Sequence, residues 1–527
     1  MELTGANVIG NKEVKTANNP LKAISPASGK ELSGEFSPAG SAEVMAAVLQ
    51  ANAAFEVYRN KTGSQKAAFL RAIADEILSL EDVLIERAMA ESGLPEARLR
   101  GERGRTMGQL KMFADLLEEG SWVRPALELA DPNRTPFPKP DIRNLLIPVG
   151  PVVVFTASNF PLAFSTAGGD TASALAAGNP VIVKAHESHL GTNELVAKAI
   201  SRAAKKTGMP SGVFSSLNGS GHELGQLLVT HPDVKSVAFT GSQKGGLALY
   251  DLAQKRDEPI PIFAEMGSVN PVVLFANSLR ANGPNISKTL ANSLTMGCGQ
   301  FCTNPGLLLV QEYEGLDEWL NGFAQEVAGI GVHGMLNRGI YESFKATKKK
   351  MLELPEVELV AESNPAQGEA LIPRSGVAKI DAAEFIQNPD LQDEVFGPYC
   401  LVVVCKDSNE ITQACKSLHG QLTGTVYGEL EDLNANPEAI AALQMQVGRL
   451  TFGGAPTGVE VNSAMQHGGP FPATTDARFT SVGSQAIYRF VRPLAYQNWP
   501  NEALPEELQD GNPLGLWRAV NGVPGKH

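Results

Sequence analysis

The feature that most constrains the fold is a rhythm of short apolar runs and helix-like segments that begins at residue 150. The runs "PVVVFTA", "PVIVKA" and "VKSVAFT" are rich in β-branched residues, and a helix-like segment follows each of them. This alternation is typical of βαβ units with a buried parallel sheet. A second alternating series runs from "NPVVLF" (270–275) to about residue 452. The sequence therefore predicts an α/β protein with two doubly wound parallel-sheet domains.

The segments outside these two series predict helices first and extended chain later. Residues 41–118 carry apolar residues at the spacing of amphipathic helices. The proline-rich stretch 131–149 cannot continue a helix and predicts an extended excursion from the main body. The tail from residue 484 is aromatic and partly extended, so it could pair with this excursion or with another subunit.

Composition limits the classes of function. The 527 residues predict two to four domains at ~150 residues each. A net charge of −13 argues against nucleic acid or an anionic membrane as a partner. Five cysteines, an odd number, argue against a disulfide framework and favour a reducing cytoplasm. We expect neither a signal peptide at "MELTGANVIGNKEVKT" nor a membrane span, because no run of 18 apolar residues occurs.

The stretch "GCGQFCTNPG" (297–306) holds Cys298 and Cys302. No histidine or acid flanks either thiol, as a local metal site would require, and a redox pair would usually have two intervening residues, not three. If 284–298 is helical, Cys302 falls just beyond it in a glycine-containing loop, where a thiolate would be reachable. Burial as a small apolar residue, the commonest state of cysteine, fits Cys298 better than Cys302.

Several polar residues follow apolar runs, and each has a functional and a purely structural interpretation. Lys184 could meet a ligand at the carboxyl edge of a parallel sheet, or it could be a surface lysine. Asn159 could donate to an oxyanion or form a turn. Ser242 could mark a phosphate-binding helix start or simply cap that helix. Glu265 ends an apolar stretch, which should raise its pKa and suit a general base, or it could cap a turn.

These motifs occur in one order: TASNFP, a strand-ending lysine, FTGS, AEMG, GQFC and EVFGP. The order resembles the aldehyde dehydrogenase superfamily over nearly the whole chain. "HGGPFPATTDARFTSVG" and "KAHESH" resemble a narrower group, the α-ketoglutarate semialdehyde (2,5-dioxovalerate) dehydrogenases and their NADP-dependent aldehyde dehydrogenase relatives. The resemblance implies NAD(P)-dependent oxidation of an aldehyde to an acid, with 2,5-dioxopentanoate as the substrate and 2-oxoglutarate as the product. A general fatty or aromatic aldehyde dehydrogenase and a CoA-acylating enzyme remain alternatives.

The family's roles carry over residue by residue. By this resemblance Cys302 is the nucleophile, Asn159 and the Cys302 N–H form the oxyanion hole, and Glu265 activates water. No metal is implied. The positions that match cofactor contacts are Lys184, His186, Glu187, Thr240, Gly241, Ser242, Glu394 and Phe396.

The matched cofactor positions do not agree on NAD or NADP. A carboxylate at Glu187 should repel a 2′-phosphate and favour NAD. The narrower resemblance favours NADP, and His186 and Lys184 could meet the extra phosphate. Both cofactors therefore stay open.

The implied oxo-acid substrate needs a cation for its carboxylate. Arg103, Arg105 and Arg478 are candidates, although all three could be surface charges, and Phe160 and Phe471 are further candidates for substrate contact. The resemblance also implies a cofactor-binding domain (1–130 and 150–266), a catalytic domain (267–483), and an oligomerisation arm and tail (131–149 and 484–527). A homodimer or homotetramer would follow.

Overall fold

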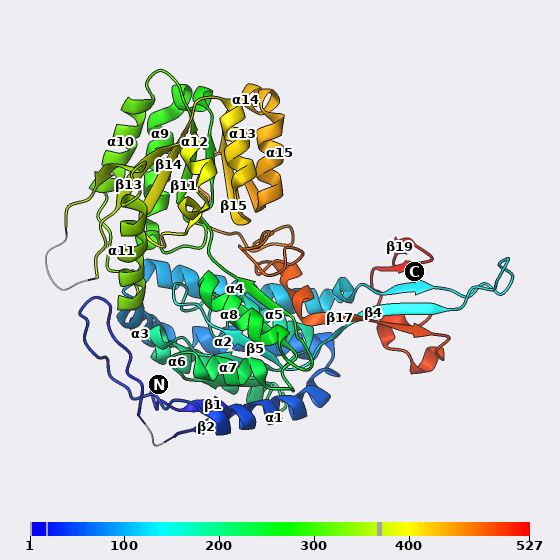
Figure 1. Ribbon diagram of the computed structural model, residues 1–527. Helices are drawn as coiled ribbons and strands as arrows, with labels where there is room; N and C mark the ends of the chain where they lie inside the picture. Colours follow the sequence, from blue (N-terminus) through cyan, green and yellow to red (C-terminus); the bar gives the residue numbers. More distant parts are fainter. Residues whose placement is uncertain (1–2, 17–18, 366–370) are drawn as a thin grey trace.

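The computed structural model describes residues 3–16, 19–365 and 371–527 and contains three sheets. In Figure 1 the first sheet and its helices occupy the lower part of the body and the second sheet lies above them. The first sheet runs, in spatial order, β2 (Lys12–Val14), β1 (Asn7–Ile9), β7 (Phe214–Leu217), β6 (Val181–Lys184), β5 (Val152–Phe155), β8 (Ser236–Thr240) and β9 (Ile262–Glu265). Strands β7, β6, β5, β8 and β9 are parallel, so their carboxyl ends share one edge.

Helices cover this sheet, and the predicted helical region 41–118 is confirmed. Thr62 begins the second helix with a capping box, because its side chain accepts from the Gln65 N–H while Gln65 reaches back to the Thr62 N–H. The helices before and between the strands are α1 (Ser41–Tyr58), α2 (Gly63–Leu78), α3 (Glu81–Ser92), α4 (Glu96–Glu119), α5 (Gly169–Ala177), α6 (Leu190–Lys206), α7 (Glu223–Thr230) and α8 (Gln243–Gln254).

The second sheet contains seven strands and is parallel except for one edge strand. Its order is β12 (Glu358–Glu362), β13 (Gly376–Asp381), β14 (Tyr399–Cys405), β11 (Leu307–Gln311), β10 (Val272–Leu274), β15 (Gln421–Tyr427) and β16 (Val447–Phe452). Its helices are α9 (Ala276–Thr295), α10 (Leu316–Gly329), α11 (Arg338–Leu352), α12 (Ala382–Gln387), α13 (Ser408–Ser417), α14 (Leu430–Ala435) and α15 (Pro437–Gln446). Apolar side chains are buried on both faces, as a sheet covered by helices on both sides requires.

A smaller third sheet projects from the body as an arm, to the right in Figure 1. Its strands are β17 (Val491–Gln497), β4 (Ile142–Pro148), β3 (Ala126–Glu128), β18 (Arg518–Val520) and β19 (Val523–Gly525). Strand β17 pairs antiparallel with β4, from Val491 opposite Pro148 to Gln497 opposite Ile142. The tail therefore pairs with the proline-rich excursion, one of the two partners that the sequence left open.

The fold is thus α/β with three mixed sheets, and the predicted fold class is confirmed. The predicted domain boundaries stay a prediction. Across the described ranges, no helix is both long and apolar enough to cross a membrane.

Candidate active site

Three separated segments meet beside the carboxyl end of β9. Glu265 is the last residue of β9, and Cys302 follows α9 and a short 3₁₀ helix (Met296–Gly299). The segment 467–481 returns from the second sheet and is fixed to β9, because the Met266 N–H donates to the Ala473 carbonyl at 2.8 Å. This return places His467 between the other two side chains.

The contact of Cys302, His467 and Glu265 is the centre of the site. His467 Nε2 lies 3.4 Å from Cys302 Sγ and 2.9 Å from Glu265 Oε1. The Ser481 hydroxyl donates to the other carboxylate oxygen, Glu265 Oε2, at 2.5 Å. The sulfur, the imidazole nitrogen and the carboxylate oxygen all lie within 4.8 Å of one another, and these are also ligand types of Zn²⁺. The absence of a metal stays a prediction.

The surroundings of these groups keep the proton on the Cys302 sulfur and leave the Glu265 carboxylate ionised as the acceptor. Burial, together with the charges of Glu265 and Glu394, raises the pKa of the Cys302 thiol well above its usual value, while Arg105 lowers it. Burial would also raise the pKa of Glu265, but interactions with His467, Ser481 and Cys302 outweigh burial and hold it below the usual value. The predicted raised pKa of Glu265 is therefore wrong, because the sequence did not reveal these partners.

The backbone around Cys302 leaves one donor free. Within residues 3–16, 19–365 and 371–527, no hydrogen bond engages the Cys302 N–H. Asn159 follows β5 and donates from Nδ2 to the Gln300 carbonyl at 3.1 Å, which places its amide beside the same loop. Arg98 fixes Asn159 by donating from Nη2 to its carbonyl at 2.9 Å. The Arg98 guanidinium also lies over the rings of Phe160 and Phe301, at 4.7 and 4.5 Å.

A second side-chain amide, that of Asn270, binds the backbone of the Cys302 loop. Asn270, in a left-handed conformation with φ 47°, donates from Nδ2 to the Cys302 and Asn304 carbonyls, both at 2.9 Å. The Ser268 hydroxyl lies 3.0 Å from Asn270 Oδ1 and 2.9 Å from Gln421 Oε1. Ser268 therefore links the Cys302 loop to β15.

Cys298 differs from Cys302 in its burial and in its hydrogen-bond partner. It lies in the 3₁₀ helix beyond the end of α9, with φ 62°, and is fully buried in the core of the second sheet. Its thiol donates to the His333 carbonyl at 3.2 Å, and burial raises its pKa to about 12. Cys298 is thus the buried thiol of the pair.

The predicted cofactor residues of the first sheet lie where its parallel strands end. Lys184 ends β6, and Thr240 ends β8. Gly241 follows Thr240, and its N–H donates to the Glu265 carbonyl at 3.0 Å. Ser242 is the N-cap of α8 and accepts from the Gly245 N–H at 3.2 Å, so it performs the structural role that the sequence left open.

The charges beside Lys184 fit an anionic ligand. Burial lowers the pKa of Lys184, and the neighbouring Glu187 raises it. In the part of the chain that the structure describes, the Lys184 ammonium has no hydrogen bond or ion pair of its own. His186 accepts from the Ser188 N–H at 3.1 Å, and burial lowers its pKa far enough to make it neutral near pH 7. These residues can hold the ribose and phosphate groups of a dinucleotide.

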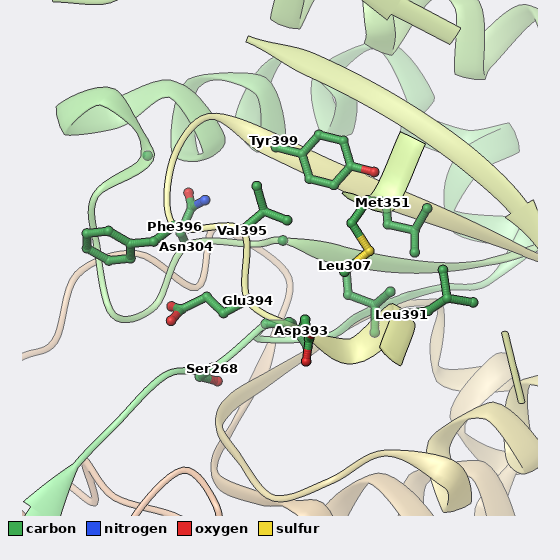
Figure 2. A pocket seen from close by; sticks show the side chains of 14 residues that line it. Ser268, Asn304, Leu307, Met351, Leu391, Asp393, Glu394, Val395, Phe396 and Tyr399 are labelled. Atoms are coloured by element: carbon green, nitrogen blue, oxygen red, sulfur yellow. The ribbon is translucent and has the colours of Figure 1, made fainter. Parts of the chain in front are cut away.

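Glu394 and Phe396 lie on one loop after η4 (Pro389–Gln392) and line a pocket with Ser268. Figure 2 shows both side chains leaving the loop toward the same side, with Ser268 next to the Glu394 carboxylate. Burial raises the pKa of Glu394 to about 7, against a lowering by the Ser268 N–H. A Cβ at Gly267 would lie 2.4 Å from Glu394 Oε2, so glycine is needed for this approach.

Four of the predicted substrate residues divide into two pairs. Phe160 and Arg105 lie near the centre: the Phe160 ring packs on Phe301 at 5.3 Å, and charge on Cys302 acts on Arg105. Phe471 and Arg478 instead line a surface cavity of about 560 Å³. Arg478 is 81% exposed and pairs with Asp476 at 2.5 Å.

Sequence reasoning missed His467, Ser481, Arg98 and Asn270. His467 opens the quoted "HGGPFPATTDARFTSVG" stretch, but it lies 165 residues from Cys302 and no spacing rule connects them. The only available signal was the presence of a histidine in a motif already noted.

Comparison with known proteins gives consistent results. The model of the aldehyde dehydrogenase family matches residues 14–340. The chain is 48% identical to alpha-ketoglutaric semialdehyde dehydrogenase 2 of Azospirillum brasilense over 99% of both chains. It is 45% identical to alpha-ketoglutaric semialdehyde dehydrogenase of Acinetobacter baylyi, over 93% of this chain and 92% of that one.

Solved structures share the fold at lower identity. A 1-pyrroline-5-carboxylate dehydrogenase from Thermus with bound NAD is 22% identical, with a TM-score of 0.78 over 93% of this chain and 92% of that one. Betaine aldehyde dehydrogenase from Staphylococcus aureus in complex with NAD+ is 20% identical, with a TM-score of 0.80 over 94% and 95%.

Proposed function

The chain belongs to the aldehyde dehydrogenase family and is an NAD(P)-dependent aldehyde dehydrogenase, and from this premise we propose that it oxidises 2,5-dioxopentanoate to 2-oxoglutarate through a thioester on Cys302. The names of two relatives at 48% and 45% identity support the substrate. The observation that carries the mechanism is the contact of Cys302 with His467 and, through it, with Glu265.

The first step forms a carbon–sulfur bond. The Glu265 carboxylate accepts the thiol proton of Cys302, and the sulfur attacks the aldehyde carbon. The carbonyl π bond breaks, and the negative oxygen is stabilised by the unused Cys302 N–H and the Asn159 amide. The product is a thiohemiacetal on Cys302.

The second step is oxidation of this carbon. NAD(P), when bound, would supply the acceptor for the hydride that leaves this carbon, and the thiohemiacetal would become a thioester. We assign the holding of the cofactor to Lys184, Ser242, Glu394 and their neighbours, because an unpaired ammonium, an exposed helix start and a buried carboxylate suit phosphate and ribose groups.

The last step is hydrolysis of the thioester. Glu265, after releasing the first proton to solvent, takes a proton from a water molecule that attacks the thioester carbon. The carbon–sulfur bond breaks, the acid leaves, and Cys302 recovers its proton. The donors from His467 and Ser481 keep Glu265 ionised and fixed in direction for both of its proton transfers. A CoA-acylating enzyme would have no need of this base.

Mass spectrometry and product analysis test this proposal. With 2,5-dioxopentanoate and cofactor, Glu265→Gln should accumulate a Cys302 adduct of the acyl mass, since hydrolysis lacks its base. Cys302→Ala should give neither adduct nor reduced cofactor. Reduced cofactor from Cys302→Ala at the normal rate would refute the covalent route, and an acyl-CoA product in place of free 2-oxoglutarate would refute hydrolysis.

The arm supports a further part of the proposal, a homodimer or homotetramer. The edge strand β17 exposes one row of backbone groups, which a second copy could pair with. Sedimentation of the intact chain and of a Leu494→Pro variant tests this, since proline in β17 removes a backbone donor. We also propose a cytoplasmic location, because Cys302 must remain a reduced thiol to act.

A further inference from the structure

Three arginines surround the centre of the site but differ in what they hold. Burial lowers the pKa of Arg98, Arg105 and Arg449, and negative charge on Cys302 acts on all three in the opposite direction. Arg98 already has partners, since its guanidinium donates to the Asn159 carbonyl and lies over two phenylalanine rings. The other two have free donors.

Arg105 and Arg449 come from different parts of the fold and bind one loop, residues 456–459. Arg449 in β16 donates from Nη1 to the Gly458 carbonyl at 2.9 Å and from Nη2 to the Pro456 carbonyl at 2.6 Å. Arg105 in α4 donates from Nη1 to the Val459 carbonyl. The loop held by Arg449 therefore orients the Arg105 guanidinium.

The remaining edge of Arg105 has no partner among the described residues. Its Nε is buried and lacks a partner, and among the described residues Nη2 has neither a hydrogen bond nor an ion pair. A guanidinium cannot lose its proton, and although nearby glutamates act on Arg105 from a distance, no carboxylate of the described residues forms an ion pair with it. The Nε–H and Nη2–H bonds are parallel and match the two oxygens of a carboxylate.

The unpaired edge of Arg105 is linked to Cys302 by a chain of contacts through Phe164 and His467. The Arg105 guanidinium carbon lies 5.9 Å from the Phe164 ring centre, and that ring lies 6.3 Å from the His467 ring, which contacts Cys302. In 2,5-dioxopentanoate the carboxylate carbon is four carbon–carbon bonds from the aldehyde carbon, roughly 5 Å when extended. A substrate of this length can extend from Cys302 past Phe164 toward Arg105.

We propose that the Nε and Nη2 edge of Arg105 binds the terminal carboxylate of an oxo-acid aldehyde, and that Arg449 positions Arg105 through the loop 456–459. This assignment rests on the proposed function, since it names the group that recognises the substrate class. The competing explanation is that Arg105 serves only the Cys302 thiolate, whose charge it also faces.

Steady-state kinetics on matched aldehydes separates these explanations. The substrates are 2,5-dioxopentanoate, 5-oxopentanoate and neutral pentanal, each with five carbons. Arg105→Gln should lower kcat/KM for both oxo acids by roughly 100-fold, because a desolvated charge pair is lost, and change it for pentanal by less than about threefold. Arg105→Lys should fall between, since a point charge lacks the planar fork.

Two further variants complete the series. Arg449→Gln should reduce the preference for oxo acids over pentanal by a smaller factor than Arg105→Gln, because it acts only through the loop. Arg103→Gln is the matched control: Arg103 lies on the same helix, is half-buried like Arg105, and donates to the Glu81 carbonyl. The ratio of kcat/KM for the oxo acids to kcat/KM for pentanal should be the same in Arg103→Gln as in the unaltered enzyme.

Equal losses on pentanal and on the oxo acids in Arg105→Gln would overturn the proposal, since the residue would then act on the nucleophile. Calorimetry with glutarate gives a readout without catalysis: Cys302→Ala should bind glutarate, and Cys302→Ala with Arg105→Gln should not. Retained glutarate binding in the double variant would also overturn it. If the unaltered enzyme oxidises 5-oxopentanoate but not 2,5-dioxopentanoate, the proposed substrate fails while a selective loss in Arg105→Gln still supports the carboxylate site.

Discussion

The edge of the first sheet and the centre around Cys302 are built in opposite ways. At the sheet edge, Lys184, Thr240 and Ser242 each follow directly from the strand that positions them. At the centre, Cys302, His467 and Glu265 come from segments up to 202 residues apart and meet only because 467–481 returns to β9. The residues at the sheet edge are thus positioned by the strands next to them in sequence, whereas the centre is positioned by contacts between distant segments.

Replacing His467 is the strongest way to test this dependence. His467→Gln keeps an N–H donor but removes the imidazole, which with Ser481 and Cys302 holds the pKa of Glu265 down. Burial then dominates, and the pKa of Glu265 rises. The acid limb of kcat/KM should move to higher pH, and kcat/KM near neutral pH should fall by roughly 100-fold.

The pH profile distinguishes this from simple damage to packing. A structural defect would lower kcat/KM equally at all pH values and leave the acid limb in place. His231→Gln serves as the control, since His231 ends α7 and its Nδ1 accepts from the Asp233 N–H. An unmoved acid limb in His467→Gln would show that the centre does not depend on this imidazole.

The same contrast explains what could be predicted from the sequence. The βαβ rhythm predicted parallel strands in both sheets, because buried parallel strands are short β-branched runs, but it did not predict the antiparallel edge strands β1, β2 and β12. Cys302, Asn159 and Glu265 became candidates through motifs next to strand or helix ends and through the family resemblance, and their roles stay predictions. His467 and Asn270 were missed, and the pKa of Glu265 was predicted in the wrong direction, because both depend on contacts over long sequence separation that only the folded chain supplies.

A smaller effect, on cofactor affinity, is expected at the pocket that Glu394 lines. Because burial raises the pKa of Glu394 to about 7, its carboxyl is protonated below that pH and ionised above it. An ionised carboxylate accepts more hydrogen bonds from ribose hydroxyls, so cofactor affinity should rise by about tenfold from pH 6 to pH 8. Fluorescence titration of NAD(P) binding measures this. Glu394→Gln should flatten the profile, and an unchanged profile would refute the assignment.

A charge change at the sheet edge should alter cofactor choice only. Glu187 is exposed beside Lys184, and at the proposed ribose-side position its carboxylate should repel a 2′-phosphate while Lys184 should attract it. Glu187→Gln should raise the ratio of kcat/KM with NADP to that with NAD by roughly three- to tenfold, and leave the acid limb where it was. A fall in this ratio would contradict a ribose-side position for Glu187. Glu223→Gln, at the start of α7, is a matched control.

The smallest effect is expected at Cys298, four residues before Cys302. Its thiol is fully buried, donates to the His333 carbonyl, and has a pKa of about 12, so almost no thiolate forms at neutral pH. Cys298→Ser retains a donor of similar size and should leave both kcat/KM and the rate of inactivation by peroxide unchanged within about twofold. Mass spectrometry should then find the first oxidation on Cys302 in both proteins. A slower inactivation of Cys298→Ser would mean that Cys298 takes part in the oxidised state. The centre around Cys302 would then include the 3₁₀ helix and reach the core of the second sheet.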